Sequence, residues 1–173
     1  MIVFDTSTLV LLAKVELLDA FLADYRGKVV IPQEVEEEAT AKKTFDGLLI
    51  GKRIEEGKIE IVLAQRDIAE LLMRDFNIGL GEAEAVAIAK EKGTLLATDD
   101  KNAIKACKVL KISIATAIDF VLRSSEKRLI SKEAALAKIG LLALHGRYSR
   151  KIISDAEQEV SGGKNAKDVK REN

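Results

Sequence analysis

Acidic side chains directly follow two apolar stretches of this sequence. Asp5 comes after residues 1–4, and Asp99 and Asp100 come after residues 94–98. Both stretches have the composition and length of buried strands. Because ligands of open α/β sheets bind at the carboxyl ends of the strands, these acids are candidates for a functional site. The structural alternative for the first of them is that Asp5 or Thr6 caps the following helix.

A third candidate, Glu38, lies on a predicted helix that begins near Pro32, the only proline of the chain. Proline suits the first turn of a helix. Glu34 and Glu38 are four residues apart and share one stripe of this helix with Val35, which we expect to pack inward. We therefore expect Glu38 to project toward the edge of the sheet. The alternative is an ordinary surface acid in the N-terminal half of a helix.

The fourth candidate, Glu82, lies in the first turn of a predicted helix that starts near Gly79 and ends at Gly93. Glu84 is two residues further on and faces another direction, so we expect only one of the two to share a site with Asp5. The structural alternative for Glu82 is a favourable interaction with the helix dipole, which contributes about 0.3–1 kcal/mol.

Carboxylates that converge at one edge of a sheet repel one another, and folding stability alone does not favour such an arrangement. A hard divalent cation relieves the repulsion, and oxygen ligands suit Mg²⁺ or Mn²⁺. With one His and one Cys, the chain lacks the usual zinc ligand sets. Magnesium held by carboxylates most often serves phosphate chemistry. The hydroxyl of Thr6 or Ser7 could bind the cation or hydrogen-bond to one of its ligands.

Strands and helices that alternate along the chain predict an α/β fold with a parallel sheet of four to five strands and right-handed crossovers. The predicted strands are 1–4, 28–31, 59–63, 94–98 and 112–115. Between them, helical spacing runs through residues 9–22, 33–38, 45–56, 66–76, 79–93 and 101–110. In the helix 66–76 we expect Ile68, Leu71 and Leu72 to face inward.

The C-terminal third is predicted to be helical, with segments at 117–123, 131–144 and 149–160. We expect residues 117–160 to form a helical extension packed on the α/β core of residues 1–116. Residues 161–173 contain few apolar side chains and are predicted to be a disordered tail.

The formal net charge is zero, so no global charge attracts nucleic acid or membrane. No apolar run approaches the length of a membrane span, and no secretory signal is recognised. The single Cys107 rules out a disulfide framework within the chain and fits a reducing compartment. We therefore expect a cytoplasmic protein.

Charge is distributed unevenly. Residues 34–38 include four glutamates, whereas residues 121–151 include eight Lys or Arg against Glu126 and Glu133. The basic stretch is interpreted either as a guide for a phosphate backbone or as an ordinary solvated helical surface.

Four short motifs together resemble the PIN domain family. The opening Ile2–Leu9 is similar to the first family motif, and Val30–Glu38 resembles the second, in which an acid follows three residues after a valine. Gly81–Ala89 resembles the third motif and Leu96–Asp100 the fourth. The resemblance covers about residues 1–116, with the motifs in the family order.

This resemblance implies a Rossmann-like sheet and an endoribonuclease that depends on Mg²⁺ or Mn²⁺. By residue-to-residue correspondence, it implies metal binding by Asp5, Glu38, Glu82 and Asp99, with Asp100 adjacent and open as the alternative to Asp99. Many members have Asp at the position of Glu82, which moves the carboxylate by one methylene. Many prokaryotic members are VapC-like toxins, which implies RNA as substrate, a homodimer, and a small antitoxin protein as partner.

Two other functions are kept as alternatives. A non-catalytic module with the same fold would bind RNA or protein, bind little Mn²⁺, and keep its biological effect in an Asp5→Asn variant. A different α/β enzyme would process a phosphate-containing small molecule at the same site. Activity on single-stranded RNA and on nucleotides, with and without Mn²⁺, discriminates among the three.

Overall fold

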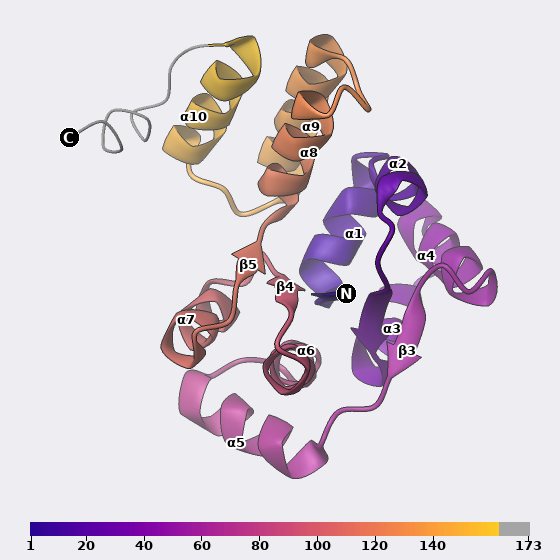
Figure 1. The fold of residues 1–173 in the computed structure, drawn as a ribbon, viewed down its shortest axis with the longest axis vertical. Helices are drawn as coiled ribbons and strands as arrows, with labels where there is room; N and C mark the ends of the chain where they lie inside the picture. Colours follow the sequence, from indigo (N-terminus) through magenta and orange to yellow (C-terminus); the bar gives the residue numbers. More distant parts are fainter. Residues whose placement is uncertain (163–173) are drawn as a thin grey trace. The chain divides into compact units, whose positions relative to one another are not determined.

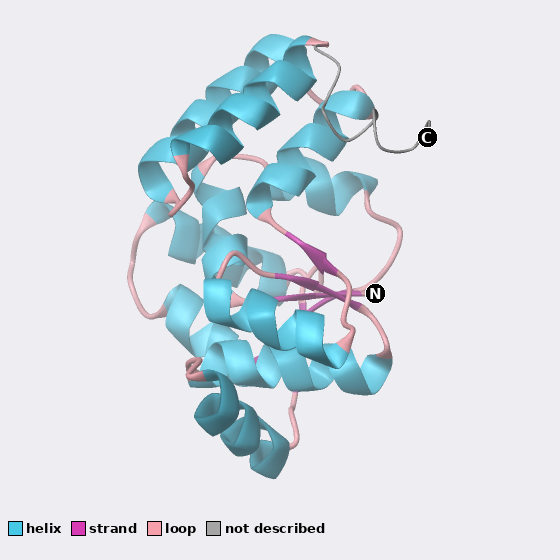
Figure 2. Cartoon of the chain, turned by 90° about the vertical axis from the view of Figure 1, so that its left-hand side faces the viewer, coloured by secondary structure: helices cyan, strands magenta, loops and turns pink. Residues whose placement is uncertain are grey.

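The computed structural model describes residues 1–162, which form two compact units, one spanning residues 1–117 and the other beginning at Ile118. The elements of the first unit are, in chain order, β1 (Ile2–Phe4), α1 (Thr6–Lys14), α2 (Leu18–Asp24), β2 (Val29–Pro32), α3 (Gln33–Thr40), α4 (Phe45–Glu55), β3 (Glu60–Val62), α5 (Arg66–Phe76), α6 (Leu80–Lys92), β4 (Leu95–Ala97), α7 (Lys101–Leu110) and β5 (Ile114–Ala115). The strands are short and most of the described chain is helical (Figure 2).

The strands form one parallel five-stranded sheet, as the sequence predicts, and their order in it is β3-β2-β1-β4-β5. β1 is the central strand and pairs with β4, with Phe4 opposite Ala97. Because these two neighbours end at the same level, the acids that follow them meet at one edge of the sheet.

Helices cover both faces of this sheet. On one face α6 packs on β1, β2 and β4, and α5 and α7 pack against α6. α1, α3 and α4 pack against one another, and Figure 1 shows α1, α2 and α4 on the side of the sheet opposite α5 and α7. The switch of faces follows from right-handed crossovers, because the chain moves outward from β1 to β3 and then in the other direction to β4 and β5.

α6 is buried along most of its length because its side chains are small. The alanines at positions 83, 85, 87 and 89 are all buried, so the helix approaches the sheet closely on one side and its neighbouring helices on others. Gly93 ends it in the left-handed conformation, as predicted from the sequence.

The prediction for α5 is wrong for two of its three inward residues. Ile68 and Leu71 are exposed, by 40% and 49%, and only Leu72 is buried. The packed stripe consists of Ala69, Leu72, Met73 and Phe76, which has the same helical spacing one residue further along. Two apolar stripes overlap in this sequence, and packing against α6 selects the second.

The helical spacing after β1 belongs to two helices rather than one. α1 ends near Lys14, and Glu16 adopts a left-handed backbone conformation, with φ of 55°, before α2 begins. This turn lets Leu17 and Leu18 join the core. Farther along the chain, Pro32 is the N-cap of α3, so that helix begins directly at the end of β2.

The second unit contains α8 (Ala117–Glu126) from its second residue onward, α9 (Lys132–His145) and α10 (Arg150–Ser161). The hydroxyls of Ser131 and Ser149 accept hydrogen bonds from the first turns of α9 and α10, which pack against each other. α10 extends one residue into the predicted tail, and the rest of that prediction, from residue 163, lies outside the described residues. Among residues 1–162, each helix is too short or too polar to cross a membrane.

Candidate active site

Asp5 is completely buried at the carboxyl end of the central strand. Its Oδ1 accepts a hydrogen bond of 2.8 Å from the backbone N–H of Thr8, so Asp5 caps α1. The hydroxyl of Thr98 donates to Oδ2 at 2.6 Å, and that of Ser7 lies 3.0 Å from both carboxylate oxygens. Asp5 therefore caps α1, as the structural alternative predicts, but the cap accounts for only one of the hydrogen bonds that its carboxylate accepts.

Burial raises the pKa of the Asp5 carboxyl from 3.8 to about 7. The hydrogen bonds from Thr98, Thr8 and Ser7 lower the pKa but do not offset burial, and the charge of Asp99 raises it further. A carboxyl that is buried beside another acid and stays surrounded by hydrogen-bond donors is typical of a functional site.

Asp99 is held at the same edge of the sheet by two donors. Its Oδ2 accepts a 2.8 Å hydrogen bond from the hydroxyl of Thr8 and a 3.0 Å hydrogen bond from the backbone N–H of Ala117. Thr8 therefore links the two acids, because its backbone binds Asp5 and its side chain binds Asp99.

Asp100 is the N-cap of α7. Its Oδ1 accepts hydrogen bonds of 2.8 Å from the backbone N–H groups of Asn102 and Ala103. Its own N–H lies 3.2 Å from the hydroxyl oxygen of Thr98, the group that also binds Asp5. The two adjacent acids thus have different local roles, with Asp99 turned toward α1 and Asp100 toward α7.

Glu38 projects from α3 toward the start of α6. The hydroxyl of Thr6 donates a hydrogen bond to Glu38 Oε2. A methyl group on Gly81 would lie 3.1 Å from the same oxygen and 3.3 Å from Val35 Cγ2. The lack of a side chain at Gly81 therefore creates the space in which this carboxylate lies.

Glu82 is half-buried in the first turn of α6 and has a raised pKa. Burial is the largest cause, and the charges of Glu38 and Asp100 add to it, whereas hydrogen bonds from the backbone of Glu82 and of Gly79 oppose it. A methyl group on Gly79 would lie 2.4 Å from Glu82 Oε2, so the carboxylate folds back over the N-terminus of its own helix.

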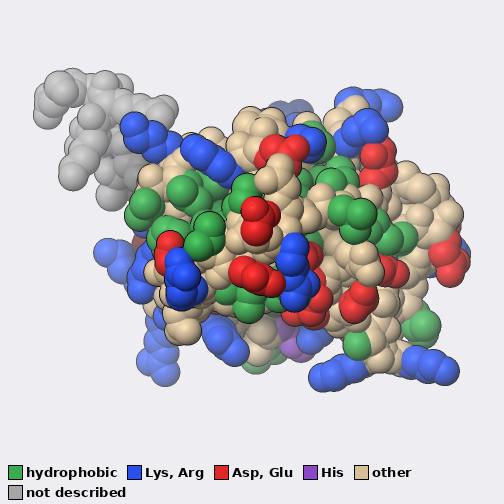
Figure 3. Space-filling model, turned by 90° about the horizontal axis from the view of Figure 1, so that it is seen from below, with side chains coloured by type: hydrophobic (Ala, Val, Ile, Leu, Met, Phe, Trp, Pro, Cys, Tyr) green, Lys and Arg blue, Asp and Glu red, His purple; other side chains and the backbone are tan. Residues whose placement is uncertain are grey.

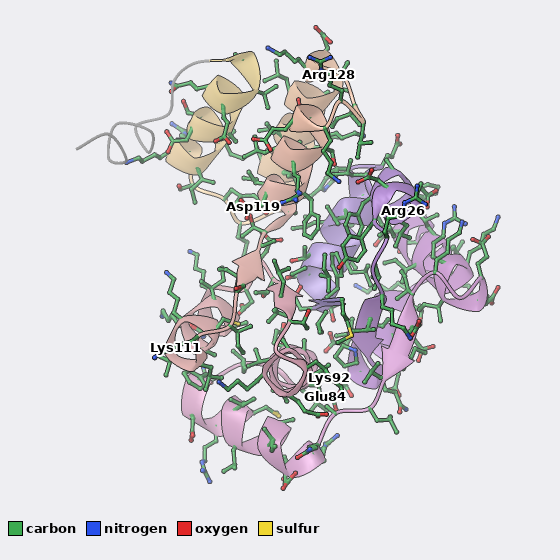
Figure 4. The ribbon with its side chains drawn as sticks, in the orientation of Figure 1. Arg26, Glu84, Lys92, Lys111, Asp119 and Arg128 are labelled. Carbon is green, nitrogen blue, oxygen red and sulfur yellow. The ribbon has the colours of Figure 1, made fainter. Side chains whose placement is uncertain are left out.

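Glu84 belongs to a different environment, as expected from its position two residues further on. Its Oε1 lies 4.0 Å from Nη1 of Arg66, and its pKa is raised by burial and by the charges of Glu34 and Glu37. Figure 4 labels Glu84 on α6.

The predicted acids thus form two adjoining groups at the edge of one sheet. The first contains Asp5 and Asp99 with Thr8 and Thr98, and the second contains Glu38, Glu82 and Asp100. The backbone of residues 5–6 and 98–100 and the hydroxyl of Thr98 connect the groups. Within residues 1–162, no three Asp, Glu, His or Cys side chains are close enough to hold one metal ion together as they stand.

The sequence did not single out Thr8 and Thr98, both of which are completely buried. A signal for Thr98 exists in the sheet register: since Phe4 pairs with Ala97, the next residues along the two strands are Asp5 and Thr98. Side chains at matching positions of neighbouring strands point to the same face, which explains the hydrogen bond between them. That register is known only from the folded chain.

A family model for DUF3368, described as PIN domain, matches residues 1–162 of this chain. The match includes both groups of acids and extends through α10. Comparison with curated proteins and with solved structures gives no match.

Proposed function

This chain belongs to the PIN domain family, and we propose that it is a metal-dependent endoribonuclease that hydrolyses RNA phosphodiester bonds. The family establishes a nuclease-type fold. The reaction, the metal and the substrate are our inference from the arrangement of acids at the carboxyl edge of the sheet.

The buried carboxyl of Asp5 is the observation that carries this proposal. Burial raises the pKa of this carboxyl to about 7, and the negative charge of Asp99 nearby raises it further. Glu82 lies within the fields of Glu38 and Asp100 and also has a raised pKa. Such an arrangement costs folding free energy, which a bound cation would recover.

The donor set fits a hard divalent cation, because every candidate ligand is a carboxylate oxygen. We assign its binding to Asp5, Glu38, Glu82 and Asp99, with Asp100 as the alternative to Asp99. When bound, Mg²⁺ or Mn²⁺ supplies Lewis-acid activation for hydrolysis of a phosphodiester.

The hydroxyls around the acids orient the carboxylates by hydrogen bonds. Thr98 and Ser7 hydrogen-bond to Asp5, Thr8 to Asp99, and Thr6 to Glu38. Each hydroxyl restricts the rotamer of one carboxylate, so the acids are oriented before any ligand arrives. The sequence left open whether Thr6 and Ser7 bind the cation or hydrogen-bond to one of its ligands, and their contacts with Glu38 and Asp5 support the second role.

The test is a cleavage assay on single-stranded RNA with the purified protein. We expect cleavage with Mn²⁺ or Mg²⁺, none with EDTA, and a loss of at least about 100-fold in Asp5→Asn, on the scale of other essential catalytic groups. Glu84→Gln is the matched control: it removes an acid from α6 outside the site and leaves cleavage within about twofold.

Three results would contradict this proposal. Cleavage that persists in EDTA would exclude the metal, and full cleavage by Asp5→Asn would exclude the assigned site. If the protein leaves RNA intact but hydrolyses nucleotides, it is the enzyme acting on a phosphate-containing small molecule. Absence of any hydrolysis together with weak Mn²⁺ binding would identify the non-catalytic module.

The cellular setting belongs to the same proposal. We infer a cytoplasmic protein that forms a homodimer and, in a toxin–antitoxin pair, is inhibited by a small antitoxin. Light scattering tests the dimer directly. Growth arrest on expression of the wild type, and none on expression of Asp5→Asn, tests the toxin role.

A further inference from the structure

α7 contains three exposed lysines and no acid, and a fourth exposed lysine follows its last residue. Lys101, Lys105 and Lys108 follow one another at intervals of four and three residues, so they form one row along the helix, and Lys111 follows its C-terminus. At 1.5 Å per residue the row covers about 10 Å. The opposite face, formed by Ala103, Ala106 and Cys107, is buried.

Within residues 1–162, these ammonium groups lack acidic partners. Among the described residues, no carboxylate lies within 4.0 Å of the side-chain nitrogen of Lys101, Lys105, Lys108 or Lys111. By contrast, Lys28, Lys58 and Lys92 are paired with Glu60, Glu56 and Glu91, all within 3.0 Å. Lys105 Nζ is 3.4 Å from Asn102 Oδ1, a neutral group on the same helix.

The row starts at the candidate site. Asp100 accepts the hydrogen bonds that begin α7, and Lys101 is the next residue. α7 also packs against α6, which carries Glu82. Because helix and acids belong to one compact unit and share these contacts, their relative positions are set by the fold.

Acidic and basic side chains are adjacent at the start of α7, where Asp100 precedes Lys101. Seen from below, the surface carries both Lys or Arg and Asp or Glu side chains (Figure 3). Figure 4 labels Lys111 at the end of α7 farthest from the cap residue Asp100. An acidic centre next to a row of lysines that have no acidic partner in the described part of the chain suits a ligand with regularly spaced negative charges.

We propose that the lysine row of α7, Lys101, Lys105 and Lys108, binds the phosphate backbone of single-stranded RNA and guides it to the acids. The guidance rests on the proposed nuclease function, whereas backbone binding by α7 does not. Lysine is a point charge that contacts phosphate without reading bases, and α7 has no aromatic side chain on which a base could stack. Binding through this row is therefore independent of RNA sequence.

The basic stretch 121–151, which the sequence left open as a phosphate guide or a solvated helical surface, is a different segment of the chain. That stretch lies in the second compact unit, whereas α7 belongs to the same unit as the acids. The lysines of α7 are fewer, but no acid of their own helix competes with the phosphates for them.

The test compares two triple variants that change the net charge equally. The first is Lys101→Gln with Lys105→Gln and Lys108→Gln. The control is Lys28→Gln with Lys58→Gln and Lys92→Gln, which removes three lysines that already have acidic partners. Glutamine keeps a helix propensity close to that of lysine, so α7 remains folded. Circular dichroism and the thermal midpoint verify this.

Affinity for a fluorescent single-stranded RNA is measured in EDTA over a series of salt concentrations. We expect the α7 variant to lose at least about tenfold in affinity at low salt and the control less than about threefold. Each lost phosphate contact lowers the salt slope by about 0.7, so the slope of the α7 variant falls by about 2. Equal losses in both variants, an unchanged slope, or no binding by the wild type would overturn the proposal.

A cleavage assay with Mn²⁺ separates this proposal from the proposed function. If the wild type binds RNA through α7 but does not cleave it, the nuclease function is contradicted, whereas RNA binding by the lysine row is supported. If the α7 variant binds and cleaves RNA as well as the wild type does, RNA binding by the lysine row is contradicted, whereas the nuclease function is supported.

Discussion

The protonation of Asp5 connects the stability of this protein to its chemistry. The folded chain holds its proton more tightly than the unfolded chain, because the pKa rises from 3.8 to about 7. The stabilisation that this shift provides is complete below about pH 3.8 and is lost as the pH rises through about 7. At neutral pH and above, the metal-free protein must therefore accommodate a buried negative charge.

Asp5→Asn removes this pH dependence. Without metal, we expect the variant to match the wild type near pH 4 and to exceed its unfolding free energy above pH 7, by up to about 4 kcal/mol. Urea denaturation in EDTA between pH 4 and pH 8 measures the difference. A variant that is less stable than the wild type at every pH would show that Asp5 is needed as a structural cap.

Thr98→Val tests the hydroxyl that joins Asp5 to Asp100. The substitution keeps the shape of the side chain but removes the donor to Asp5 Oδ2 and the acceptor for the N–H of Asp100. We expect a loss of about 1–3 kcal/mol in stability and a further rise in the pKa of Asp5, because this hydrogen bond lowers it.

Thr98→Ser is the control for that substitution, since it keeps the hydroxyl and removes only a methyl group, worth about 0.8 kcal/mol. NMR titration of the Asp5 carboxyl follows the pKa in each variant. If serine and valine shift the pKa equally, the hydroxyl of Thr98 does not orient Asp5.

At the scale of elements, close packing between α3 and α6 decides where Glu38 lies. Gly81 has no side chain, and this permits Glu38 Oε2 and Val35 to approach the backbone of α6. The glutamate is therefore positioned by two helices rather than by its own helix alone, which is why the stripe on α3 did not by itself identify its role.

Gly81→Ala is expected to displace the carboxylate of Glu38. The added methyl would lie 3.1 Å from Oε2 and 3.3 Å from Val35 Cγ2, so the carboxylate must shift by several tenths of an ångström. We expect Mn²⁺ affinity and cleavage to fall by about 10- to 100-fold, as for other changes that disturb the support of a metal ligand. Calorimetry and the RNA assay measure these effects.

Gly140→Ala is the matched control in α9. Among the described residues, no atom outside the adjacent residues and the backbone of α9 lies within 4 Å of the added methyl. Because the glycine is in a helix interior, we expect a stability gain of about 0.5–1 kcal/mol and unchanged cleavage. Equal cleavage by both variants would show that the space at Gly81 does not matter for the site.

The elements themselves were largely predictable, and the errors have local causes. The helices and the parallel sheet follow from apolar spacing and from glycine and proline positions. The inward face of α5 was wrong, because the apolar stripe through Ile68 and Leu71 and the one through Ala69, Leu72 and Met73 share a periodicity. Only contact with α6 distinguishes them.

At the scale of the whole molecule, a cation that binds the folded chain must stabilise it. We expect Mn²⁺ at 100 times its dissociation constant to add about 2.7 kcal/mol at pH 8 and to raise the thermal midpoint. The effect should shrink as the pH falls through about 7, where the carboxyl of Asp5 takes up a proton. Thermal unfolding with and without EDTA measures it.

Asp5→Asn is expected to lose this stabilisation, while Glu84→Gln keeps it. A midpoint that rises equally in wild type and Asp5→Asn would place the cation elsewhere on the chain. A midpoint unaffected by Mn²⁺ in the wild type at pH 8 would contradict metal binding at the acids altogether.

The sequence by itself determined the fold class, the strands that end in acids and the residues that bear the candidate chemistry, because periodicity and residue type are local properties. Tertiary structure alone decided that Thr8 binds Asp99, that Thr98 binds Asp5, and that the acids after β1 and β4 lie at one edge of the sheet. These facts depend on sheet register and helix packing, which bring together residues more than 90 positions apart, as in the pair Thr98 and Asp5. No local pattern encodes such distances, so the chemistry was visible in the sequence but its geometry was not.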